Sequence, residues 1–330
     1  MSEHRVVAIT GASAGVGRAT AREFAMHGDN IGLIARGEER LEDARRELEG
    51  MGVRVSVAPA DVADPDQLDG AAEKIEAELG PIDVWINNAM TSVFAPVWQI
   101  TPEEFRRVTE VTYLGQVNGA MAALKRMKPR DRGVILHVGS ALAFRGIPLQ
   151  SAYCGSKHAI EGFVESLRTE LEHEGSHVRV ATAHMPAMNT PQFDWVKSKL
   201  SHRAQPVPPI FQPEIAAEAL YWMANHDRPY LLVGLPTVAT VWANRIAPSL
   251  TDRYLAKTGF ESQQTQQMED PDRPDNLWAP VSGHQAAHGR FDERSHGSSR
   301  QLFVSTHLKP LLAAVGAVGA TAFMLRRAFS

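Results

Sequence analysis

The sequence predicts a doubly wound α/β fold, in which a parallel sheet of about seven strands has helices on both faces. Short runs rich in Val and Ile alternate with longer segments of helical period. Strands separated by helices imply right-handed crossovers and therefore parallel pairing. The runs are apolar almost throughout, as in strands that are buried on both faces. A glycine-rich turn directly after the first run is typical of the same fold.

The expected elements follow one another up to about residue 260. Strands are expected where short runs of β-branched and apolar residues occur, at 5–10, 30–35, 53–59, 82–88, 133–140, 177–184 and 229–234. Helices are expected where apolar residues recur every three to four positions, near 15–28, 37–50, 65–79, 102–128, 152–174 and 213–226. Because no internal repeat interrupts this order, residues 1–260 are interpreted as one domain.

Composition excludes some classes of protein. The 330 residues are 44% hydrophobic and 22% charged, which allows a sizeable core. A net charge of −4 gives no basic face for a nucleic acid, so no nucleic-acid partner is expected. The single cysteine, Cys154, excludes a disulfide within the chain and fits a reducing compartment. The N-terminus lacks a long apolar stretch, so we expect no signal peptide and a cytoplasmic domain.

The chain changes character after residue 260. Residues 261–305 are polar, rich in Pro, Gly and His, and without period, which predicts a linker with little fixed structure. Four histidines in 284–307 match no standard ligand spacing, so no metal site is expected. Residues 306–330 are predicted to form an apolar helix. Its uncharged part, 310–325, is shorter than the roughly 20 residues of a full membrane span. It is interpreted as a membrane anchor, or alternatively as a helix packed on the domain or a partner.

A phosphate-binding turn is predicted directly after the first strand. The stretch TGASAGVGRA carries glycines at Gly11, Gly15 and Gly17, and a helix begins within it. Glycines let the backbone approach a pyrophosphate, and the free N–H groups at a helix start bind its charge. Because the glycines lie between a strand and a helix, they predict a dinucleotide site.

With these glycines, Ser140 and the stretch YCGSK that follows it, residues 5–235 resemble the classical short-chain dehydrogenase/reductase family. The resemblance implies a Rossmann fold that binds NAD(P) and transfers a hydride between the cofactor and a carbonyl or alcohol. It also implies a homo-oligomer. The residues that it assigns to the cofactor are Gly11, Ser13, Ala14, Gly15, Val16, Gly17, Asp61, Val62, Asn88, Ala89, Tyr153, Lys157, Pro186 and Thr190. Two positions depart from the family pattern, since Met90 and Ala187 stand where it has glycine.

The end of the second strand bears on the choice of cofactor. NAD enzymes usually have an acidic side chain there, which binds the ribose hydroxyls. Here Ala35 takes that place and Arg36 follows. A guanidinium fork suits a 2′-phosphate, so NADP(H) is favoured over NAD(H). The alternative is that Arg36 is only solvated.

Ser140, Tyr153 and Lys157 are predicted to carry the chemistry. Ser140 ends a central strand at the carboxyl edge of the sheet, where ligands bind in open α/β folds. Lys157 lies one helical turn after Tyr153 and favours the tyrosinate electrostatically. Ser140 can donate a hydrogen bond to a carbonyl oxygen as charge develops on it. By resemblance, Thr112 takes the place of an asparagine that supports a proton relay.

The substrate is expected to be lipophilic, because apolar residues gather in the segments that the family uses around the substrate. They are Met90, Val93, Phe94, Leu142, Phe144, Ile147, Leu149, Phe193, Trp195, Pro206, Pro208, Ile210 and Phe211. Ordinary core packing is the other interpretation of each. Two other functions stay open at this point: a nucleotide-binding scaffold without turnover, and epimerase or dehydratase chemistry on the same fold.

Overall fold

The doubly wound fold is confirmed in the computed structural model, which describes residues 4–283 and 286–307. Seven strands form one sheet in the order β11-β7-β6-β4-β1-β2-β3, and every adjacent pair is parallel. The strands are β1 (Val6–Thr10), β2 (Asn30–Ala35), β3 (Val55–Pro59), β4 (Ile82–Asn87), β6 (Gly133–Ser140), β7 (Val178–Met185) and β11 (Tyr230–Leu232). The chain starts at β1, runs outward to β3 and returns to β4 beside β1. This reversal leaves a crevice at the carboxyl ends of the strands.

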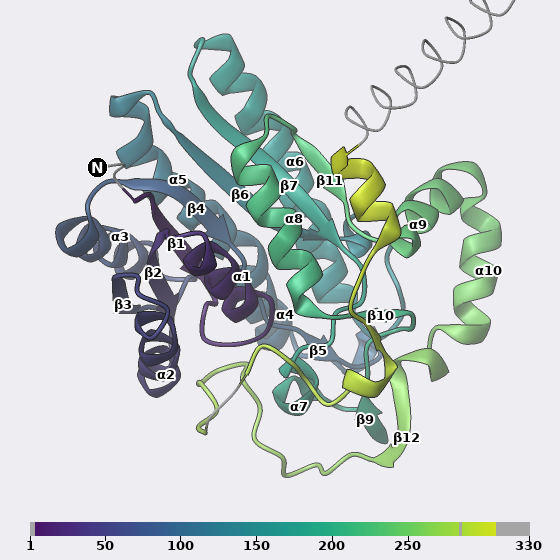
Figure 1. The fold of residues 1–330 in the computed structure, drawn as a ribbon. Coiled ribbons are helices and arrows are strands. Elements are labelled where there is room, and N and C mark those ends of the chain that lie inside the picture. Colours follow the sequence, from purple (N-terminus) through teal and green to yellow (C-terminus); the bar gives the residue numbers. More distant parts are fainter. Residues whose placement is uncertain (1–3, 284–285, 308–330) are drawn as a thin grey trace, which may run out of the picture.

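Helices cover both faces of the sheet (Figure 1). One face packs against α1 (Gly15–Met26), α2 (Glu38–Glu49) and α8 (Pro213–Asn225). The other packs against α3 (Pro65–Leu79), α5 (Gly115–Met127) and α6 (Ser151–His173). Val, Ile and Leu from the strands alternate between these two cores, as the period of a strand requires. The sheet is therefore buried on both sides and holds the site at its edge.

Local signals explain where two of the helices begin. Pro65 follows Asp64, whose side chain accepts hydrogen bonds from the amides of Asp66 and Gln67 at the start of α3. Thr101 and Glu104 form a reciprocal capping box at the start of α4 (Pro102–Thr109). A short π-helical segment, Glu110–Leu114, joins α4 to α5 and holds Thr112.

The segment after residue 260 differs from the expected linker. Within it, β12 (Gln264–Met268) pairs antiparallel with β9 (His202–Ala204), and β13 (Ser295–His296) pairs with β10 (Ile210–Phe211). Residues 269–283, here called the strap, cross the cofactor side of the domain (Figure 1), and Leu277 is fully buried. The expectation failed because the segment is held by pairing with short strands that are far away in the sequence, and such pairing leaves no periodic pattern in its own residues.

Two further helices extend the fold beyond the sequence prediction. After β11 the chain forms α9 (Leu235–Ile246) and α10 (Pro248–Thr258), a pair at the right of Figure 1, here called the hairpin. The remaining short elements are β5 (Val93–Phe94), α7 (Gln192–Trp195) and β8 (Lys197–Ser198). The predicted anchor at 310–325 lies outside the described residues. Within the described ranges, no helix is long and apolar enough to cross a bilayer.

Candidate functional site

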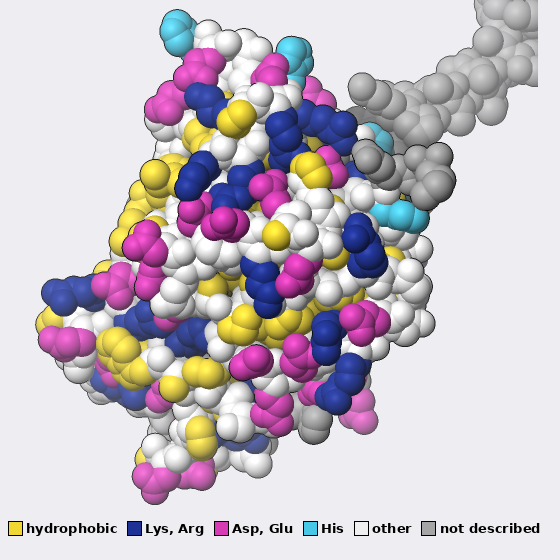
Figure 2. Space-filling model, turned by 90° about the vertical axis from the view of Figure 1, so that its left-hand side faces the viewer, with side chains coloured by type: hydrophobic (Ala, Val, Ile, Leu, Met, Phe, Trp, Pro, Cys, Tyr) yellow, Lys and Arg dark blue, Asp and Glu magenta, His cyan; other side chains and the backbone are white. Residues whose placement is uncertain are grey.

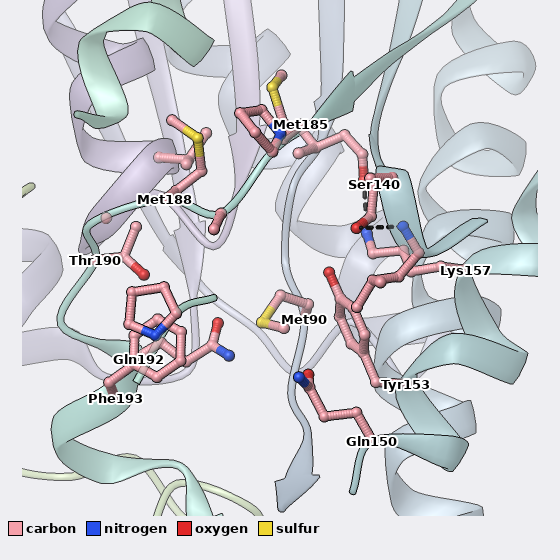
Figure 3. A pocket seen from close by; sticks show the side chains of 18 of the residues that line it. Met90, Ser140, Gln150, Tyr153, Lys157, Met185, Met188, Thr190, Gln192 and Phe193 are labelled. Atoms are coloured by element: carbon pink, nitrogen blue, oxygen red, sulfur yellow. Dashed lines mark hydrogen bonds between the residues drawn. The ribbon is translucent and has the colours of Figure 1, made fainter. Parts of the chain in front are cut away.

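A cavity of about 800 Å³ opens at the carboxyl edge of the sheet. Its walls include Gly11 and Gly15 of the glycine turn, Asn88 after β4, Ser140 at the end of β6 and Tyr153 on α6. The crevice predicted from the strand order and the cavity therefore coincide. Figure 3 shows Tyr153, Ser140 and Lys157 on one side of the cavity and Thr190 and Phe193 on the other, with Met90 between them.

The glycine turn has the geometry of a phosphate cradle. Gly11 and Gly15 have φ values of 66° and 57°, which side chains disfavour. A Cβ at Gly17 would lie 2.2 Å from the carbonyl oxygen of Gly11, so only glycine fits there. Asn88 braces the turn, since its Nδ2 donates to the carbonyl oxygens of Thr10 at 2.9 Å and Gly11 at 3.2 Å. Ser13, Ala14 and Val16 also line the cavity.

Arg36 and Arg40 bring two guanidinium groups to the cavity. Arg36 donates to the carbonyl oxygens of Asn276, Leu277 and Trp278 in the strap. Arg40 donates to those of Val281 and Gly283, and its guanidinium lies 4.5 Å from the centroid of the Trp195 ring. Burial lowers the pKa of both arginines below the ordinary value.

Asp61 and Val62 line the cavity beside Arg36. The carboxylate of Asp61 pairs with Arg107 from α4 and accepts a hydrogen bond from the amide of Ala63 at 3.0 Å. The Asp61 side chain is thus fixed by protein groups. Ala89 also lines the cavity, and the Thr10 hydroxyl accepts a hydrogen bond from its amide at 3.1 Å.

Ser140, Tyr153 and Lys157 lie together in the cavity. The Tyr153 hydroxyl points toward Ser140 (Figure 3). Lys157 Nζ donates to the carbonyl oxygen of Val138 at 2.6 Å and lies 5.6 Å from the centroid of the Tyr153 ring. The Ser140 Oγ also accepts a hydrogen bond from the amide of Leu142 at 3.1 Å. A substrate oxygen beside Tyr153 would therefore meet two hydroxyls and an ammonium nearby.

Burial dominates the ionisation of Tyr153 and Lys157. It raises the pKa of Tyr153 above the ordinary value, and the hydrogen bond with Ser140 acts in the opposite direction. It lowers the pKa of Lys157 to about 7, while the negative charge of Glu161 acts to raise it. Each group is thus pushed toward its neutral form. A tyrosinate at this position requires a positive charge beside it, and protonated Lys157 is the neighbouring cation.

Thr112 is hydrogen-bonded to the backbone of Thr91. Its hydroxyl donates to the carbonyl oxygen of Thr91 at 2.8 Å and accepts from the Thr91 amide at 3.0 Å. The side chain is fully buried and is not part of the cavity wall. The relay role that the resemblance implies for Thr112 stays a prediction.

The sequence analysis did not identify the pair of polar residues, Glu161 and His184, that lies behind Lys157. Glu161 follows Lys157 by one turn of α6, and its Oε2 lies 3.4 Å from Nε2 of His184 on β7. His184 is fully buried, and its Nδ1 lies 3.4 Å from the carbonyl oxygen of Ser140. The i,i+4 spacing of Lys157 and Glu161 was the one signal available in the sequence.

Both departures from the family pattern, Met90 and Ala187, line the cavity. Pro186 and Thr190 line the cavity as expected by resemblance, with Ala187 and Met90 beside them. Among the described residues other than glycine, only Asp131 and Leu149 have positive φ. Alanine at 187 is therefore not strained.

The expected substrate wall is divided between cavity and core. The residues that line the cavity are Met90, Leu142, Ile147, Phe193, Trp195, Pro206 and Pro208. Those outside the wall are Val93, Phe94, Phe144, Leu149, Ile210 and Phe211, of which all but Phe144 are buried. The hairpin supplies a wall that sequence reasoning missed, including Thr240, Ala243, Leu250, Tyr254 and Leu255.

Comparison with known proteins shows the family of the chain. Residues 5–200 match the family described as short chain dehydrogenase. The uncharacterized oxidoreductase YxnA of Bacillus subtilis is 31% identical over 321 residues, 97% of this chain and 89% of that protein.

Two solved structures show the same fold with different cofactors. An alcohol dehydrogenase from the archaeon Thermococcus sibiricus, complexed with 5-hydroxy-NADP, is 28% identical with a TM-score of 0.61, covering 70% of this chain and 95% of its own. A short chain dehydrogenase from Mycobacterium paratuberculosis bound to NAD is 27% identical with a TM-score of 0.61, covering 71% and 97%. Such neighbours hold both kinds of nicotinamide cofactor. The chain belongs to the short-chain dehydrogenase family of oxidoreductases.

Proposed function

We propose that this protein is an NADP(H)-dependent oxidoreductase that interconverts a carbonyl and an alcohol, with Tyr153 as acid and base. The observation that carries the proposal is the meeting of Ser140, Tyr153 and Lys157 in one cavity with the glycine turn. A dinucleotide fits this cavity, because the cradle at Gly11 and Gly17 is one that a Cβ would fill.

Tyr153, Ser140 and Lys157 have different roles at the substrate oxygen. When bound, the nicotinamide supplies or accepts the hydride. In reduction, the Tyr153 hydroxyl gives its proton to the substrate oxygen, and Ser140 donates a hydrogen bond to the same atom as charge develops. Protonated Lys157 stabilises the tyrosinate that remains. In oxidation, the tyrosinate takes the proton back.

NADP(H) is proposed over NAD(H) because of Arg36 and Arg40. Both guanidinium groups reach the cavity, and their hydrogen bonds are to neutral carbonyl oxygens of the strap. A 2′-phosphate would give them a dianionic partner in place of these carbonyls, and charge-assisted bonds are the stronger kind. A ribose without this phosphate would leave the carbonyls as their partners.

The substrate is proposed to be a lipophilic ketone, aldehyde or alcohol. The cavity continues from Tyr153 between Met90, Phe193 and Leu142 toward Leu250 and Leu255 of the hairpin. Such a wall binds apolar carbon chains by removing them from water. A screen of carbonyl compounds of rising chain length with NADPH would test this, and a preference for short polar substrates would contradict it.

Replacing Tyr153 by Phe tests the catalytic proposal. Removal of the acid should lower kcat by at least about 100-fold, while calorimetry should still show NADPH binding. Tyr221→Phe, on α8 away from the cavity, is the matched control and should keep full activity. Full activity of Tyr153→Phe would refute its role. NADPH binding without turnover of any substrate by the natural sequence would instead indicate a scaffold.

Membrane attachment and oligomerisation complete the proposal. The uncharged run 310–325, flanked by Lys309, Arg326 and Arg327, supports an anchor. The full-length protein should therefore sediment with membranes and leave them only on addition of detergent; recovery in the high-speed supernatant would exclude the anchor. The homo-oligomer rests on family resemblance alone, and light scattering of the detergent-solubilised protein would test it.

A further inference from the structure

The hairpin carries a row of large apolar side chains on its outer side. Leu235, Trp242, Ile246, Leu250 and Tyr254 are each between 54% and 77% exposed. Together they are here called the hairpin face. Single exposed apolar residues are common, but a cluster of this kind marks an interaction site. The face of the domain shown in Figure 2 differs, since acidic and basic side chains are mixed across it.

The hairpin face has few partners within the described part of the chain. In α9 only Thr237 is buried, and in α10 no residue is. The inner side of both helices lines the substrate cavity through small and apolar residues such as Thr240, Ala243 and Leu255. A helix that is apolar on two sides requires an apolar environment beyond its own domain.

Charge at the edge of the hairpin face favours an anionic lipid surface. Arg245, Arg253 and Lys257 are exposed next to the apolar row. The one carboxylate in the hairpin, Asp252, pairs with Arg145. The hairpin is thus locally cationic on a chain whose net charge is −4. Trp and Tyr together with cationic residues are the composition of segments that lie at the boundary of headgroups and acyl chains.

The last described segment packs along β11, the strand that leads into the hairpin. Residues 300–307 are helical, and Gln301 Nε2 donates to the carbonyl oxygen of Leu232, three residues before α9 begins. Phe303 and Val304 are 56% and 48% exposed there. The apolar run 310–325 follows directly. The described chain ends beside the start of β11, where Arg228 donates to the carbonyl oxygen of Ser305 at 2.8 Å.

We propose that the hairpin face lies in the surface of an anionic bilayer and that the substrate cavity opens toward the lipid. Leu250 and Tyr254 support the opening of the cavity toward the lipid, because each is exposed on the hairpin face and also lines the cavity. A lipophilic substrate can then pass from the acyl chains to Tyr153 without crossing water. This inference rests on the proposed anchor and lipophilic substrate.

A fluorescent probe on the full-length protein tests the contact. Ile246→Cys is labelled with the environment-sensitive dye NBD, and Met26→Cys on α1, which is 63% exposed, serves as the matched control. The natural Cys154 is buried, which keeps it from the label. Vesicles of phosphatidylcholine and phosphatidylglycerol are added, with and without nitroxide-labelled lipid. NBD at 246 should shift to the blue and be quenched by the nitroxide, and NBD at 26 should do neither.

Four results would overturn the proposal, and they differ from one another. Failure of both proteins to float with vesicles removes the anchor as well as the hairpin contact. Flotation without a shift at 246 removes the hairpin contact alone. A blue shift without vesicles that grows with protein concentration identifies a second copy as the partner. A shift without vesicles at every concentration identifies a segment of the same chain. NADPH turnover of a soluble carbonyl, measured in parallel, reports separately on the proposed enzyme activity.

Discussion

Among the described residues, no carboxylate forms an ion pair with the buried amino group of Lys157. Its Nζ donates to the carbonyl oxygen of Val138, and burial lowers its pKa to about 7. Near neutrality, its charge therefore depends on small changes around it. Glu161, one turn further along α6, is the neighbour that raises this pKa, and His184 lies 3.4 Å from the Glu161 carboxylate. We infer that this pair holds Lys157 in its charged form.

Glu161→Gln should move the pH profile of turnover. The proposed mechanism needs protonated Lys157, so activity should fall as pH rises through the pKa of this lysine. Loss of the Glu161 charge lowers that pKa, and the falling limb of kcat/KM should therefore shift to lower pH. The exposed Glu172→Gln on the same helix is the control and should leave the profile unchanged. A profile that is identical in Glu161→Gln would show that the carboxylate does not act on Lys157.

Arg36→Ala should separate the two cofactors. Loss of a charge-assisted contact to the 2′-phosphate costs about 1.5–3 kcal/mol, which corresponds to roughly a 10-fold to 100-fold rise in the Kd of NADPH. The Kd of NADH should change little, because NADH lacks that phosphate. Arg46→Ala, exposed on α2, is the control. Equal losses for both cofactors would place Arg36 outside the phosphate subsite.

Among individual residues, the sequence predicts those functional groups that lie on neighbouring elements of the chain. Ser140, Tyr153 and Lys157 are predictable because one strand and one adjacent helix present them. Thr112 was assigned by resemblance, and its relay role stays a prediction; its hydroxyl is bonded to the backbone of Thr91. His184 was not found, because its strand reaches Glu161 only through packing across the fold.

Among the elements, the strap shows the limit of periodic patterns. The sheet and its covering helices carry periods of two and 3.6 residues, which the sequence displays. The strap has no such period. Its backbone carbonyls accept hydrogen bonds from Arg36, Arg40 and Arg107 instead, and its Leu277 enters a core cluster beside Tyr153. Order that depends on distant arginine side chains cannot be seen in the local composition.

Leu277→Ala should loosen the strap. Truncating a fully buried leucine costs about 2–5 kcal/mol. In this variant the loss should weaken the packing of the strap against the domain. Chymotrypsin should then cleave faster after Trp278, which lies within the strap and is 54% exposed, and mass spectrometry of the first fragments would show it. Met268→Ala is the control, since Met268 is 66% exposed. Unchanged cleavage would mean that the arginine contacts suffice without the leucine.

In the whole molecule, the cavity joins parts that are far apart in the sequence. The glycine turn comes from the first twenty residues, Tyr153 from the middle, the hairpin from 235–258 and the strap from the last quarter of the described chain. The doubly wound sheet was predictable because it repeats one unit. The way in which the edge of the sheet is enclosed was not predictable, because it depends on which segments after β11 fold back over that edge.

Calorimetry of the full-length protein with and without NADPH would test whether these parts form one cooperative unit. Because the strap is bonded to Arg36 and Arg40 and the hairpin to the cavity wall, we expect one unfolding transition rather than a separate early melting of the late segments. Ligand at 100 times its Kd contributes about 2.7 kcal/mol to the folded state. For a chain of this size the midpoint should then rise by about 4 °C. Tyr153→Phe, which keeps the cavity, should show the same rise. A second transition at lower temperature that NADPH does not move would mean that the strap and hairpin fold independently of the cofactor site.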